Sequence, residues 1–89
     1  MRLDRYLKVS RLIKRRSVAK EVADGGSIFV NGRVAKPSTE IKIGDELELK
    51  LGRNIIGVKV LLLLEHADVI QAEEMYEVLY QESMTERRS

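Results

Sequence analysis

The residues with the clearest chemical capacity are basic side chains crowded into residues 11–20. This stretch, RLIKRRSVAK, holds five of the sixteen lysine and arginine residues of the 89-residue chain. Lysine and arginine bind phosphate oxygens, and the arginine fork can bind two oxygens at once. A charge run is often only a solvated helix face, but here the flanking segments are patterned to fold and few acids neutralise the run. The stretch therefore predicts a structured surface for a nucleic-acid backbone.

The two parts of the chain carry opposite charge. Residues 1–36 contain ten bases and three acids, a net charge of +7, whereas residues 37–89 contain six bases and eleven acids, a net charge of −5. Such asymmetry favours a polyanion at one face and repels it from the other. The few aromatic residues do not form a base-stacking set, so recognition of a backbone or a folded RNA shape is expected.

Catalytic chemistry has little support in the sequence. The chain has one histidine, His66, and no cysteine, so neither a nucleophile with its base nor a cysteine–histidine metal site is expected. Glu73 with Glu74, and Glu46 with Glu48, are neighbouring carboxylates that we interpret as solvated faces. We expect no catalytic residue, no metal and no cofactor, and hence a protein that is not an enzyme.

Length and composition predict a single domain over residues 1–89. Two separate cores would each be too small to be stable in a chain of this length. The longest apolar run, residues 60–64, is far shorter than the roughly 20 residues of a membrane span. The absence of cysteine fits a reducing compartment. We expect a soluble cytoplasmic protein that is a monomer when free and has no membrane partner.

A first helix is predicted to present basic residues on its solvent side. Leu3, Tyr6, Leu7, Ser10 and Ile13 have the spacing of one helical stripe, and because Leu12 fits it poorly the helix is predicted to end near there. Arg5, Lys8 and Arg11 lie on the opposite side. Asp4 either pairs with Lys8 one helical turn away or orients a nearby arginine, and the sequence leaves both roles open.

A second helix and an antiparallel sheet are predicted to follow. Ser17 is a suitable N-cap, and Gly25-Gly26 a suitable stop, for a helix of about two turns. Asn31-Gly32 is a strong hairpin signal between the β-favouring runs 27–30 and 33–35. Residues 46–51 alternate between leucine and charged residues, and residues 55–64 are predicted to return as a longer strand.

A terminal helix completes the predicted fold. The capping-box pair Asp68 and Gln71 starts it, and the leucines at 61–64 are expected to be buried beneath it. Its apolar stripe would consist of Val69, Ala72, Tyr76, Leu79 and Tyr80. The predicted fold class is α+β, with two short N-terminal helices on a small antiparallel sheet, followed by a C-terminal helix.

The first part of the chain resembles the S-four RNA-binding domain, also called the alpha-L motif. The resemblance covers about residues 1–51 and lies in the opening RLDxxL, the helix start RSxA, the hairpin GxIxVNGxxxKxS and the turn KxGDxL. It implies an RNA-binding core of two helices on a sheet. The strand and helix predicted over about residues 55–83 would complete the same domain.

The short length and the ending AEEMYEVL are most similar to the RqcP family of bacterial ribosome-associated quality control. This resemblance implies binding to large-subunit rRNA and peptidyl-tRNA on stalled large subunits, in support of C-terminal alanine tailing by an RqcH-type factor. One alternative is another ribosome-binding S-four protein, acting in heat-shock rescue or rRNA assembly. A second is a protein-interaction module that docks a basic partner through its acidic C-terminal helix.

The predicted RNA-binding residues combine the basic set with two polar positions. The resemblance assigns RNA contact to Arg2, Arg11, Lys14, Arg15, Arg16, Ser17, Asn31 and Lys36. The charge pattern adds Arg5, Lys8 and Lys20. Asp4 matches an acidic position of the family, which implies a supporting role in organising the basic groups.

Overall fold

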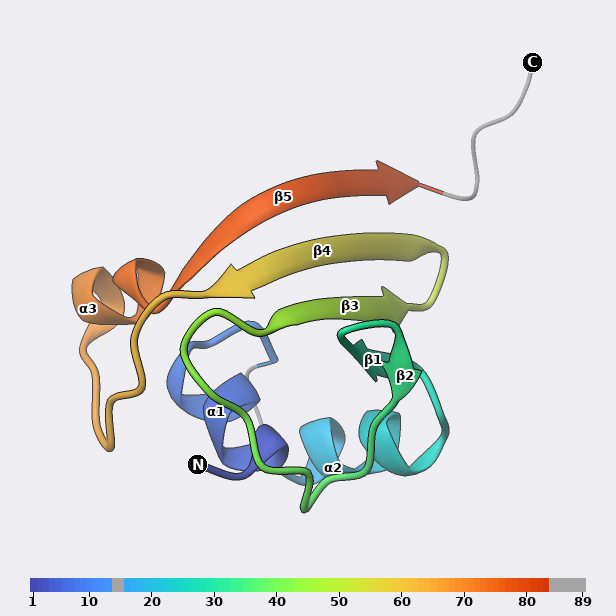
Figure 1. Cartoon of the computed structure of the whole chain (residues 1–89), viewed down its shortest axis with the longest axis horizontal. Coiled ribbons are helices and arrows are strands. Elements are labelled where there is room, and N and C mark those ends of the chain that lie inside the picture. Colours follow the sequence, from blue (N-terminus) through green and yellow to red (C-terminus); the bar gives the residue numbers. More distant parts are fainter. Residues whose placement is uncertain (14–15, 84–89) are drawn as a thin grey trace.

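Two helices lie against one face of an antiparallel sheet (Figure 1). The computed structural model describes residues 1–13 and 16–83, and within them the sheet has five strands in the order β2-β1-β3-β4-β5. The helices are α1 (Leu3–Val9), α2 (Arg16–Asp24) and α3 (Val69–Glu74), and the strands are β1 (Ile28–Val30), β2 (Arg33–Val34), β3 (Glu46–Leu51), β4 (Asn54–Val60) and β5 (Tyr76–Ser83). The predicted α+β class is confirmed. No helix in this described part is long and apolar enough to cross a membrane.

The predicted hairpin and the turn after it hold each other in place. Asn31 and Gly32 have φ angles of 51° and 85°, the left-handed pair that a tight two-residue hairpin turn requires. The Asn31 amide nitrogen donates to Asp45 Oδ1 at 3.1 Å, and its Oδ1 accepts from the backbone N–H of Glu46 at 2.9 Å. The β1–β2 turn is therefore fixed to the start of β3.

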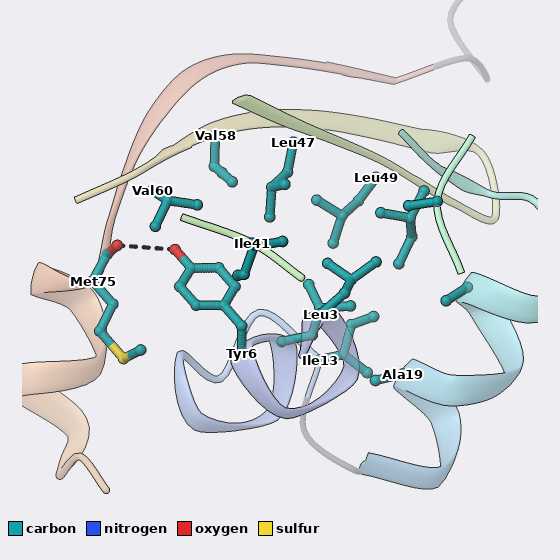
Figure 2. Packing of buried hydrophobic residues seen from close by; sticks show 14 residues of the cluster. Leu3, Tyr6, Ile13, Ala19, Ile41, Leu47, Leu49, Val58, Val60 and Met75 are labelled. Carbon is teal, nitrogen blue, oxygen red and sulfur yellow. Dashed lines mark hydrogen bonds between the residues drawn. The ribbon is translucent and has the colours of Figure 1, made fainter. Parts of the chain in front are cut away.

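The core lies between α1 and the inner face of the sheet (Figure 2). The alternation of β3 buries Leu47 and Leu49 against Leu3 and Tyr6 of α1. The Tyr6 hydroxyl donates to the backbone carbonyl of Met75 at 2.9 Å, across a separation of 69 positions. Burial raises the pKa of the Tyr6 phenol above its ordinary value of 10.0, so this donor stays protonated at neutral pH.

The predicted C-terminal helix is correct at its start and wrong in its extent. The capping box is present, since Asp68 Oδ1 accepts from the Gln71 N–H at 2.8 Å and Gln71 Oε1 accepts from the Asp68 N–H at 3.1 Å. The helix ends at Glu74, and residues 76–83 form β5 beside β4. Residues 76, 78 and 80 also have the period of a strand, and pairing with β4 satisfies backbone groups that a helix would leave open at the sheet edge.

The leucines at 61–64 do not continue the strand, and only Leu63 and Leu64 are partly buried against the core. β4 ends at Val60, and Leu61 and Leu62 are 40% and 39% exposed. Both of their N–H groups donate to the Met75 carbonyl, at 2.8 and 3.2 Å, so the chain leaves the sheet at this point. The prediction failed because the helix expected to cover these residues is replaced by a strand that lies beside β4.

On the outer face of the sheet, the side chain of Tyr80 reaches from β5 across β4 to β3. Tyr80 of β5 lies opposite Gly57 of β4, which in turn lies opposite Glu48 of β3. A Cβ atom at residue 57 would overlap the Tyr80 ring, so glycine is required for this close approach. The Tyr80 hydroxyl donates to Glu48 Oε1 at 2.6 Å, and this bond raises the pKa of the Tyr80 phenol to about 12.

We expect Glu48→Gln to lower the pKa of Tyr80 from about 12 towards the ordinary 10.0, because the anionic acceptor favours the neutral phenol. The folded-state pKa is the raised one, so the stabilisation is present below pH 10 and is lost as the pH rises towards 12. Titration of the Tyr80 ring signals by NMR measures the shift. Glu77→Gln, a like change on an exposed β5 residue, should leave the pKa in place. An unchanged pKa in Glu48→Gln would contradict the assigned cause.

Candidate nucleic-acid interface

Three of the predicted basic residues line one hollow beside α1. Arg5, Lys8 and Arg11 recur every third position, so they follow one side of the helix and of the turn after it. The hollow has a volume of about 530 Å³, and its other wall is the segment 65–67. Three cations around a concave surface can bind adjacent phosphates of one nucleic-acid strand.

Glu65 occupies part of this hollow and holds Arg5. Arg5 Nη2 lies 2.8 Å from Glu65 Oε1 and 3.4 Å from the Glu65 carbonyl oxygen. The side chains of Arg5 and Glu65 are 37% and 73% exposed, so the ion pair is solvated and worth at most about 1 kcal/mol. Arg5 Nε is buried and donates to no group within the described residues. A phosphate in the hollow would therefore have to compete with the Glu65 carboxylate for the Arg5 guanidinium.

Glu65→Gln is expected to raise affinity for RNA about two- to fivefold, because it removes the carboxylate that competes for Arg5. Titration of labelled RNA by fluorescence anisotropy measures the change. Glu73→Gln makes the same change of net charge on exposed α3 and should raise affinity less. Equal gains in the two variants would mean that only net charge matters, and that Glu65 has no specific place in the hollow.

Arg11 adopts a backbone conformation that arginine rarely takes. α1 ends at Val9, earlier than the predicted end near Leu12, and Arg11 comes soon after with a φ angle of 62°. Its N–H donates to the Lys8 carbonyl at 3.0 Å, and the Ile13 N–H donates to the Leu7 carbonyl at 3.1 Å. Glycine or asparagine usually occupies this position after a helix, because the left-handed backbone conformation costs most other residues about 1–2 kcal/mol. Residues held in such backbone conformations cluster at functional sites.

We expect Arg11→Gly and Arg11→Ala to lose similar affinity for RNA but to differ in stability. Both remove the cation, whereas only glycine relieves the left-handed strain. The unfolding free energy of Arg11→Gly should exceed that of Arg11→Ala by about 0.5–1 kcal/mol, after the greater entropy of glycine in the unfolded chain is counted. Urea unfolding gives the stabilities, and anisotropy gives the affinities. If Arg11→Gly were instead clearly less stable than the unsubstituted chain, the Arg11 side chain would be a structural element.

Asp4 orients an arginine at the start of α1. Its carboxylate is 3% exposed, with Oδ2 3.2 Å from Arg2 Nη2 and Oδ1 accepting from the Arg5 N–H at 2.8 Å. The ion pair with Arg2 fits the second of the two roles that the sequence left open. The Arg2 side chain remains half exposed and is therefore available to a ligand.

The loop of residues 36–41 lies beside Arg2. The N–H groups of Leu3 and Asp4 donate to the carbonyls of Thr39 and Pro37, at 2.8 and 3.1 Å, and this satisfies donors at the start of α1. Lys36 is exposed next to Pro37, so the fold brings it to the segment that carries Arg2. Glu40 accepts from the N-terminal ammonium at 2.6 Å, and this bond and charge lower the pKa of the Glu40 carboxyl.

α2 places Lys20 on its solvent side, because Ala19 and Ala23 are buried against the core. The helix begins at Arg16, so the predicted N-cap Ser17 is instead its second residue. The positive end of the helix directly follows the connection from α1. The predictions for Lys14 and Arg15, and those for the side chains of Arg16 and Ser17, lie outside the described residues.

Asn31 is a predicted site residue that does not line the hollow beside α1. Its side-chain amide is occupied by Asp45 and by the N–H of Glu46, and it lies at the hairpin turn. RNA contact by Asn31 stays a prediction. Conversely, Glu65 and His66 line the hollow and were not predicted. Sixty positions separate Arg5 from Glu65, and only the path of the folded chain brings them together.

Known proteins match both the first part and the whole of this chain. The S4 domain matches residues 1–47. The RQC P-site tRNA stabilizing factor of Listeria innocua is 57% identical over 88 residues, which covers 99% of this chain and 96% of the relative. The protein of the same name from Bacillus subtilis is 49% identical over 86 residues, covering 97% and 100%.

The fold also matches a solved structure. The trimeric structure of Vibrio cholerae Heat Shock Protein 15 superposes with a TM-score of 0.81 at 29% identity, covering 88% of this chain and 80% of that one. The match with the S4 domain covers more than half of the chain, and the curated relatives match over nearly their whole length. The chain therefore belongs to the S4-domain family, in the group of proteins named RQC P-site tRNA stabilizing factor.

Proposed function

We propose that this chain is a non-enzymatic RNA-binding factor that stabilises peptidyl-tRNA on stalled large ribosomal subunits. The observation that carries the proposal is the hollow beside α1, where Arg5, Lys8 and Arg11 face a single concave surface. Arg2, held by Asp4, and Lys36 extend the basic surface past the start of the helix. The described residues that line the hollow include three cations and no tyrosine or phenylalanine, which suits phosphates and folded RNA better than unstacked bases.

The names of the relatives support a place of action on the ribosome. Proteins that share 57% and 49% of their residues with this chain are named for stabilising P-site tRNA in ribosome quality control. We infer the same role here, with large-subunit rRNA as a second ligand and an RqcH-type factor as the partner that adds the alanine tail. Such a role belongs to the cytoplasm.

Electrostatic binding should make affinity for the stalled subunit fall steeply with salt. If six cations neutralise phosphates, the slope of log K against log salt should be about −4 to −6. Pelleting of the full chain with large subunits over a range of potassium concentrations measures the slope. A flat dependence would contradict binding through the basic surface.

Co-sedimentation separates the proposed role from other ribosomal roles. The tagged full chain should be enriched on large subunits that carry peptidyl-tRNA, relative to empty large subunits and intact ribosomes. Equal enrichment on empty subunits would favour rRNA assembly. Enrichment only after heat shock would favour a rescue role, which the likeness to Heat Shock Protein 15 makes the second candidate. Enrichment on none of these particles would overturn the ribosomal proposal as a whole.

A further inference from the structure

The outer edge of β5 is an open side of the sheet. β5 pairs with β4 on one side, and no other strand of residues 1–13 and 16–83 lies beyond it. In Figure 1 it runs along the edge of the sheet farthest from α1 and α2. A strand of eight residues with unpaired N–H and C=O groups is long enough to accept a further strand from another chain.

Apolar side chains are exposed along this edge. Val78 and Leu79 are 48% and 43% exposed. The Tyr80 ring leads the other way, across Gly57 of β4 to Glu48 of β3. The register shifts between Gly57 and Val58 of β4, and Leu79 has no partner there. A bulge of this kind twists an edge and discourages long regular pairing, yet strand segments on both sides of it remain open.

Charge determines which kind of segment fits. Residues 65–82 contain six acids and no lysine or arginine. Within β5, Glu77 and Glu82 are exposed. A second copy of β5 would bring like charges together, and a nucleic acid would be repelled. A basic extended segment meets neither penalty, because its cations would face the glutamates while its apolar residues cover the exposed side chains.

We propose that the β5 edge binds an extended protein segment in which lysine or arginine alternates with apolar residues, and that this segment joins the sheet as a sixth strand. Main-chain hydrogen bonds would supply the affinity, and the glutamates of β5 would select a basic partner. The edge is separate from the residues of the basic hollow. The protein can therefore hold RNA at the helices and a basic protein segment at β5 at the same time.

A synthetic peptide tests the edge without the ribosome. The probe is a fluorescein-labelled peptide of alternating lysine and valine, about as long as β5, and its matched control alternates glutamate and valine. The full chain should bind the basic peptide, and hydrogen exchange should slow at the backbone amides of residues 76–83. Failure to bind the basic peptide, equal binding of the acidic one, or slowed exchange confined to α1 and α2 would each overturn the proposal.

Paired charge reversals test the selection of the partner. Glu77→Lys with Glu82→Lys should weaken binding of the basic peptide roughly tenfold, because each lost attraction becomes a repulsion. Glu21→Lys with Asp24→Lys makes the same change of net charge at exposed positions of α2, and should change binding less than about twofold. Circular dichroism confirms that both variants fold. Equal losses in the two variants would show that net charge, and not the β5 edge, attracts the peptide.

Discussion

Replacing Lys8 and Arg11 together by glutamate is expected to weaken RNA binding by more than about a hundredfold. Both residues line the hollow beside α1, and both are exposed. A charge-assisted hydrogen bond is worth about 1.5–3 kcal/mol, so two lost phosphate contacts cost about 3–6 kcal/mol before repulsion is counted. Anisotropy titration with tRNA or an rRNA fragment at fixed salt measures the loss.

The control for this variant makes the same change of net charge elsewhere. Lys42→Glu with Arg53→Glu alters two exposed residues in turns outside α1 and α2. Long-range repulsion alone should then weaken binding only several-fold at physiological salt, because charges beyond about 8 Å are largely screened. Similar losses in the two double variants would remove the hollow from the binding surface. The melting temperature should change little in either, since none of the four side chains is buried.

Tyr6→Ala is expected to cost about 3–5 kcal/mol of unfolding free energy, which is most of the stability of a chain this small. The ring is fully buried in the core cluster, and its removal leaves a cavity between α1 and the sheet. Urea unfolding monitored by circular dichroism measures the loss. RNA binding should fall with the folded fraction and recover at lower temperature.

Tyr6→Phe separates burial from hydrogen bonding. It keeps the ring and deletes only the hydroxyl that donates to the Met75 carbonyl. That carbonyl also accepts from Leu61 and Leu62, so it retains partners and the cost should be only about 0.5–1.5 kcal/mol. A loss as large as that of Tyr6→Ala would mean that the hydrogen bond, and not the packed ring, holds α1 to the junction between α3 and β5.

Features set by neighbouring residues were predictable from the sequence. The Asn31-Gly32 turn depends on the φ angles of two residues, and the alternation of Leu47 and Leu49 assigns the inner face of β3 without knowledge of the rest. The capping box at Asp68 is equally local. The strand β5 was not predictable, because residues 76–83 fit a helix or a strand, and the free edge of β4 decides between them.

In the candidate site, too, local features were predictable and contacts between distant residues were not. Arg5, Lys8 and Arg11 were predicted as a set because helical spacing groups them, and the structure brings these residues of α1 and the turn after it around one hollow. Glu65 was not predicted, since a loop acid carries no local signal of an arginine that lies 60 positions away. The left-handed backbone of Arg11 was also missed, because arginine is not a residue that marks such a helix end.

The contact between Tyr6 and Met75 can form only late in the synthesis of the chain. The two residues are 69 positions apart, and Arg5 and Glu65 are 60 apart. On a growing chain α1 and the loop of residues 36–41 that bonds to its start leave the ribosome first, whereas Glu65 and Met75 follow much later. Contacts between such distant residues also form slowly, because long loops must close before the contacts stabilise them. A nascent chain therefore exposes Arg5, Lys8 and Arg11 before the segment 65–67 can complete the hollow.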